Sequence, residues 1–110
     1  GKIVNIASML SFQGGIRVPS YTASKSAVMG VTRLLANEWA KHNINVNAIA
    51  PGEIETSILS AGTELIVDQQ IPMHRLGKPE EVASLVHFLC TRGASYINGS
   101  EIHVNGGQHV

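Results

Sequence analysis

Two short apolar runs and one run of alternating apolar and polar residues are separated by longer stretches of helical pattern, and this order constrains the fold more than any other feature of the sequence. The runs are KIVNIA at 2–7, INVNAIA at 44–50 and SEIHVN at 100–105. Each has the length of a strand and is followed by turn-forming or polar residues. Strands separated by helices form parallel sheets through crossover connections, with the helices packed on the sheet faces. The sequence therefore predicts an α/β fold with a three-stranded parallel sheet.

The segments between these runs predict helices. One covers about 20–42, where apolar residues recur at spacings of three and four, and Asn43 can adopt the left-handed conformation that ends a helix. A short helix is expected near 61–70. Another opens at Pro79, which is followed by two glutamates, the preferred order for a helix start. Its apolar stripe consists of Val82, Leu85, Val86 and Leu89.

Composition narrows the class of partner. The 110 residues include eight Lys and Arg and eight Asp and Glu, so no surplus of charge favours nucleic acid or a membrane surface. The longest apolar stretches are far below the roughly 20 residues that span a bilayer. The single cysteine, Cys90, excludes a disulfide within the chain and is expected to be buried. The five histidines show no metal-ligand spacing. We expect a small molecule or another protein as partner and a cytoplasmic location.

Tyr21 and Lys25 lie four residues apart at the start of the first predicted helix and so share one face of it. A nearby ammonium and the helix dipole both stabilise a phenolate, the form of tyrosine that accepts a proton. Ser8 follows the first predicted strand, at the sheet edge where ligands of parallel sheets bind, and its hydroxyl could orient a substrate oxygen. A cationic nicotinamide beside the pair would stabilise the phenolate further. Taken alone, this spacing is more typical of an amphipathic surface than of a catalytic pair.

The ordered set of motifs is more specific than any one of them. Ser8, YTASK at 21–25, VNAIAPG at 46–52 and VNGG at 104–107 together resemble the short-chain dehydrogenase/reductase family over the whole chain. The resemblance implies an NAD(P)-dependent oxidoreductase in which residues 1–110 form the carboxyl-terminal catalytic half of a Rossmann-type doubly wound sheet. The glycine-rich phosphate loop and the residue that selects NAD or NADP would then lie upstream of residue 1.

The resemblance also implies roles for individual residues. Tyr21 would be the general acid/base, Ser8 would orient the substrate oxygen, and Lys25 would support the tyrosine and bind the nicotinamide ribose. The residues expected to contact the cofactor are Tyr21, Lys25, Pro51, Gly52, Ile54 and Thr56.

Residues 1–52 look close to members of the family that act on sugar acids such as 2-deoxy-gluconate or its keto relatives. Arg17 would then be a candidate clamp for a carboxylate, although an exposed loop arginine is an equally open interpretation. His74 is a second candidate for substrate contact, and its neighbour Arg75 is a further one. The alternatives are a 3-oxoacyl-carrier-protein reductase and a non-catalytic fragment or interaction module of the same fold. A homo-oligomer, dimer or tetramer, is expected for the full-length protein.

Overall fold

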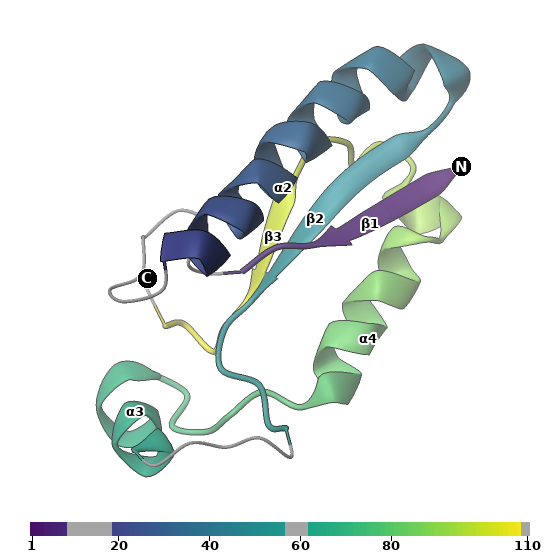
Figure 1. Ribbon diagram of the computed structural model, residues 1–110. Coiled ribbons are helices and arrows are strands. Elements are labelled where there is room, and N and C mark those ends of the chain that lie inside the picture. Colours follow the sequence, from purple (N-terminus) through teal and green to yellow (C-terminus); the bar gives the residue numbers. More distant parts are fainter. Residues whose placement is uncertain (9–18, 57–61, 109–110) are drawn as a thin grey trace.

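The computed structural model describes residues 1–8, 19–56 and 62–108 (Figure 1). Strands and helices alternate along the chain, as the sequence predicts. The strands are β1 (Lys2–Ile6), β2 (Asn45–Pro51) and β3 (Glu101–Val104). The helices are α2 (Pro19–Trp39), α3 (Thr63–Gln70) and α4 (Pro79–Leu89), with short 3-10 turns η1 (Ala40–His42) and η2 (Arg92–Ala94).

The strands form one parallel sheet in the order β1-β2-β3, which confirms the predicted α/β class. Lys2 lies opposite Asn45 in the pairing of β1 with β2. Pro51 lies opposite Val104 in the pairing of β2 with β3. This register brings the carboxyl ends of the strands to one edge of the sheet.

Helices α2 and α4 cover opposite faces of this sheet (Figure 1). Successive residues of a strand point to opposite faces, and β2 shows the consequence. Ala48 packs with Met29 of α2, whereas Ile49 packs with Leu89 of α4. All four side chains are buried. The central strand is therefore covered on both sides, which explains its nearly continuous apolar sequence.

Helix α4 packs as its sequence predicts, but α2 presents a less obvious face to the sheet. The apolar stripe of α4 lies in the core cluster around Ile49. On α2, Val31 and Leu34 are about half exposed, while Thr32 is fully buried. The hydroxyl of Thr32 accepts from Asn5 Nδ2 at 3.0 Å and donates to the Val28 carbonyl at 2.7 Å. The buried face of α2 thus includes a hydrogen-bonded polar residue, which hydropathy does not reveal.

Two predictions at helix ends have different outcomes. Asn43 has φ 59° and ψ 41°, the left-handed conformation expected of it, and its N–H bonds to the Ala40 carbonyl. Cys90, in contrast, is exposed, so its predicted burial is wrong. It follows Leu89 at the end of α4, and the helical rotation that buries Leu89 turns the next residue outward.

Asparagine side chains fix the turn that leads into β3. Asn47 Nδ2 donates to the Ile97 carbonyl, and Asn47 Oδ1 accepts from the Ser100 N–H, both at 2.9 Å. Asn98 Oδ1 accepts from the Val46 N–H at 2.9 Å. These bonds hold β3 against β2. Within the described segments, no helix is long and apolar enough to cross a bilayer.

Candidate active site

The carboxyl ends of β1 and β2 place two of the predicted site segments side by side. The N–H of Ala7 donates to the Ile49 carbonyl at 2.7 Å, which continues the pairing of β1 with β2 past the last residue of the strand. Ser8 comes next and is 8% exposed. The turn of Pro51 and Gly52 begins two residues after Ile49. The Ser8 hydroxyl is therefore held on a fixed backbone at the edge where parallel sheets bind ligands.

The first turns of α2 bring Tyr21 and Lys25 to the same edge. The ammonium of Lys25 lies 5.7 Å from the centroid of the Tyr21 ring. It also donates to the Ile6 carbonyl at 3.1 Å, two residues before Ser8. Figure 1 shows the start of α2 beside the end of β1. Lys25 thus links the helix that carries the phenol to the end of β1, two residues before Ser8.

These donors suit a ligand with several oxygen atoms. The Tyr21 side chain is half exposed, so a bound molecule can reach its phenol. Lys25 keeps further N–H donors beyond the one directed at Ile6, because an ammonium carries three. A hydroxyl, a phenol and an ammonium can together bind the hydroxyls of a ribose and a substrate alcohol or carbonyl. The residues present therefore fit a nicotinamide nucleotide.

Gly52 allows β2 and β3 to approach closely where β2 ends. A Cβ at this position would lie 2.8 Å from Asn105 Cβ and 3.0 Å from Asn105 Cα. The N–H of Gly52 donates to the Val104 carbonyl at 2.9 Å. The turn that the family motif assigns to the cofactor is therefore pinned to the end of β3 by a contact that no larger residue permits.

Downstream of this turn, Ile54 and Gly77 form an isolated parallel bridge. Ile54 is partly buried and Thr56 is exposed. His74 lies on the loop between α3 and α4, where its side chain is exposed and its φ of 55° is left-handed. Arg17, the other residue predicted to contact substrate, lies outside the described residues.

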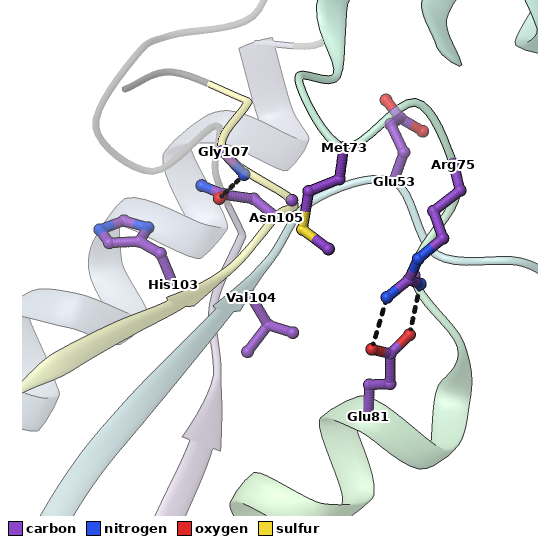
Figure 2. Close-up of a pocket in the computed structure, with 10 residues that line it drawn as sticks. Glu53, Met73, Arg75, Glu81, His103, Val104, Asn105 and Gly107 are labelled. Atoms are coloured by element: carbon purple, nitrogen blue, oxygen red, sulfur yellow. Dashed lines mark hydrogen bonds and ion pairs between the residues drawn. The ribbon is translucent and has the colours of Figure 1, made fainter.

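Beside this bridge, a cavity of about 300 Å³ opens between the end of β3, the loop before α4 and the start of α4 (Figure 2). Arg75 and Glu81 both line this cavity and form a bidentate ion pair, with distances of 2.7 and 3.0 Å. The hydrogen bond from Arg75, together with one from the Lys78 N–H, lowers the pKa of Glu81 from 4.5 to about 2. The same bond raises the pKa of Arg75.

Sequence reasoning missed this ion pair. Glu81 is predicted only as an acidic residue in the first turn of α4, and Arg75 only as a possible substrate contact. A glutamate at the third position of a helix commonly accepts from the backbone N–H at the helix start, which is a recognisable signal. The partnership with Arg75 has no such local signature.

Comparison with known proteins decides the family. The family model described as Enoyl-(Acyl carrier protein) reductase matches residues 1–109. The chain belongs to the short-chain dehydrogenase/reductase family. The resemblance inferred from YTASK and the accompanying motifs is thus confirmed.

Among curated members of the family, the chain is 59% identical to a 2-dehydro-3-deoxy-D-gluconate 5-dehydrogenase of Dickeya dadantii, over 97% of this chain and 44% of that protein. It is 48% identical to the 3-oxoacyl-(acyl-carrier-protein) reductase FabG of Aquifex aeolicus, again over 97% of this chain and 44% of the relative. The chain thus spans less than half the length of these relatives.

A solved structure agrees with this relationship. The putative 2-deoxy-d-gluconate 3-dehydrogenase from Agrobacterium tumefaciens, crystallised with bound NADP, superposes with a TM-score of 0.92 at 53% identity. The match covers 98% of this chain and 46% of that one. The described sheet and helices are therefore those of a Rossmann-type member of the family.

Proposed function

We propose that the protein is an NAD(P)-dependent oxidoreductase that interconverts a secondary alcohol and a ketone, and that residues 1–110 form the catalytic half of its domain. The observation that carries this proposal is the position of Lys25. Its ammonium lies 5.7 Å from the centroid of the Tyr21 ring and donates to the carbonyl of Ile6, two residues before Ser8. Phenol, ammonium and hydroxyl are the groups that a proton transfer to or from a substrate oxygen needs.

In the proposed mechanism Tyr21 exchanges a proton with the substrate oxygen. Lys25 stabilises the phenolate that remains when Tyr21 has donated its proton, because an adjacent positive charge favours the charged form. Ser8 donates a hydrogen bond to the substrate oxygen and holds it within reach of the phenol. A bound nicotinamide would supply the hydride chemistry, and the protein would supply binding and orientation.

The cofactor would be held by two parts of the described chain. Tyr21 and Lys25 offer donors to the ribose, while the turn from Pro51 to Thr56 offers backbone groups and the Thr56 hydroxyl. The bound NADP of the Agrobacterium tumefaciens structure supports a nicotinamide nucleotide as the ligand. We propose NAD or NADP as cofactor and the cytoplasm as location. The half-exposed apolar residues on the outer face of α2, Val31 and Leu34, support a homo-oligomer.

The substrate we propose is a sugar acid related to 2-dehydro-3-deoxygluconate. The identity of 59% to the Dickeya dadantii dehydrogenase supports it over a 3-oxoacyl thioester, since the reductase named for that substrate is 48% identical over the same share of the chain. Arg17 and His74 are the candidate substrate contacts. The positive charge of the Arg17 side chain would suit the carboxylate of a sugar acid.

The substitution Tyr21→Phe in the intact protein tests the proposal. Loss of the phenolic oxygen should lower kcat by about 10²- to 10⁴-fold, the usual contribution of a positioned acid or base. Lys25 and the turn from Pro51 to Thr56 remain, so cofactor binding should persist, weakened by no more than the loss of one hydrogen bond. Turnover is followed by NAD(P)H absorbance with a sugar acid and, separately, a 3-oxoacyl thioester.

Tyr96→Phe is the matched control, because Tyr96 is fully exposed in the turn between η2 and β3. It should retain full activity. Undiminished turnover in the Tyr21 variant would remove Tyr21 from the mechanism. An unaltered protein that oxidises or reduces neither substrate with NAD or NADP would refute the proposed activity.

A further inference from the structure

Ile54 and Thr56 lie on a stretch of backbone that belongs to no helix and is joined to its neighbour by one isolated bridge. The N–H of Gly77 donates to the Glu53 carbonyl at 2.9 Å, and the N–H of Glu55 donates to the Gly77 carbonyl at 2.7 Å. These two backbone hydrogen bonds, both to Gly77, thus fix the position and direction of this segment. Its placement depends on where Gly77 is held.

The side chain of Ile54 strengthens this dependence. A Cβ at Gly77 would lie 2.7 Å from Ile54 Cδ1, so the isoleucine rests directly on the glycine backbone. A larger residue at position 77 would force the end of the Ile54 side chain to shift. A displacement of Gly77 would therefore move Ile54, through both the bridge and the packing.

Gly77 is in turn flanked by two groups that bind the same carboxylate. Glu81 accepts two bonds from the Arg75 guanidinium and one from the Lys78 N–H, the last at 2.9 Å. Arg75 also donates to the carbonyl of Leu76 at 3.1 Å. Figure 2 shows the guanidinium and the carboxylate facing each other, with Glu53 close to the loop that carries Arg75. The turn around Gly77 is thus tied down on both sides.

The carboxylate itself stands on a rigid element. Glu81 is in the first turn of α4, and the other end of that helix is anchored by Leu89, which is 1% exposed in the core against Ile49. An unbroken series of contacts therefore runs from the core through α4 and Glu81 to Gly77 and Ile54. Isolated surface ion pairs contribute little, but a bidentate pair that shares its carboxylate with a helix start fixes a geometry.

From this we infer that Arg75 and Glu81 are positioning residues for cofactor binding. The ion pair fixes the turn around Gly77, and that turn fixes the segment carrying Ile54 and Thr56 against the nicotinamide end of the cofactor. This inference rests on the proposed function, since it assigns these two residues to the same cofactor site. It predicts that the pair affects cofactor affinity and leaves the proton-transfer step unchanged.

The test compares Arg75→Gln, Glu81→Gln and the double variant in the intact protein. Glu81→Gln keeps an oxygen that can accept from the Lys78 N–H but loses the charge that pairs with Arg75. The dissociation constants of NAD and NADP, measured by calorimetry without substrate, should rise about threefold to fivefold in each single variant. The double variant should bind the cofactor no more weakly than either single variant, because both substitutions remove the same interaction.

Steady-state kinetics separate positioning from general destabilisation. The KM for the cofactor should rise in parallel with its dissociation constant. At saturating cofactor, kcat should stay within about twofold of the unaltered protein, because Tyr21 and Lys25 stand on α2, away from the pair. A merely structural role would instead lower the fraction of active enzyme, and with it kcat, at unchanged KM.

Arg92→Gln is the control, since Arg92 is an exposed arginine in η2, beyond the far end of α4. This substitution should leave the dissociation constant and the KM of the cofactor unchanged. Cofactor affinity within about twofold of the unaltered protein in both single variants would overturn the inference. Multiplicative losses in the double variant would also overturn it. Failure of the unaltered protein to bind either nucleotide would instead refute the proposed function, and the positioning role with it.

Discussion

Replacing Gly52 by alanine should destabilise the protein, and the structure gives the size of the effect. The new methyl carbon would lie 2.8 Å from Asn105 Cβ and 3.0 Å from Asn105 Cα. Carbon atoms pack best at about 3.5 to 4.0 Å, so the first contact is too short by about 0.7 Å. Both opposing atoms are fixed by the backbone of Asn105, and no change of rotamer can move them.

Relief of this clash must separate the ends of β2 and β3. The bond of 2.9 Å between the Gly52 N–H and the Val104 carbonyl opposes that movement. Overpacking of this kind costs about 1 to 3 kcal/mol of unfolding free energy. Urea titration followed by circular dichroism measures the loss, provided that the m-value does not change.

Gly30→Ala is the matched control for this substitution. Gly30 lies within α2, and a Cβ there would have no heavy atom within 4 Å. Alanine should therefore stabilise the helix by about 0.5 to 1 kcal/mol through its higher helix propensity. If Gly52→Ala proved as stable as the unaltered protein, the close approach of β3 to this turn would not limit stability and the reasoning would fail.

Three further effects on stability follow. Leu89→Ala should cost about 2 to 5 kcal/mol by urea titration, because it empties a fully buried site against Ile49; a loss under 1 kcal/mol would contradict this packing. Asn43→Gly should be neutral or stabilising and Asn43→Ala should cost about 1 kcal/mol, since alanine resists a φ of 59°; equal urea midpoints for the two would contradict it. Because the folded pKa of Glu81 is lowered from 4.5 to about 2, its stabilising effect is complete above the unfolded value of 4.5 and is lost as the pH falls towards 2. The difference in urea midpoint between the unaltered protein and Glu81→Gln should therefore vanish over that range, and a constant difference from pH 6 to 2 would contradict it.

Local sequence was sufficient to predict the elements and the shared helix face of Tyr21 and Lys25. The run at 44–50 reads as a buried strand, and the order of Pro79 before two glutamates reads as a helix start. The structure has β2 at Asn45–Pro51 and α4 at Pro79–Leu89. The spacing of Tyr21 and Lys25 predicts their shared face, since residues four apart on a helix are neighbours. The left-handed conformation of Asn43 also follows from its residue type, because asparagine tolerates this conformation at a helix end.

Features that depend on how distant segments meet were not predictable in this way. Thr32 is buried on α2 beside Asn5 of β1, whose side chain donates to its hydroxyl. The exposure of Cys90 depends on which side of α4 the sheet covers.

The sequence by itself determined the strand and helix order, the sheet edge that carries Ser8, and the family. Each of these follows from residue type, spacing and chain order. Only the tertiary structure decided that Gly77 supports Ile54 and that one carboxylate holds both Arg75 and the start of α4. The physical reason is that a contact between two segments depends on their approach in space, and spacing along the chain specifies only the contacts made within one element.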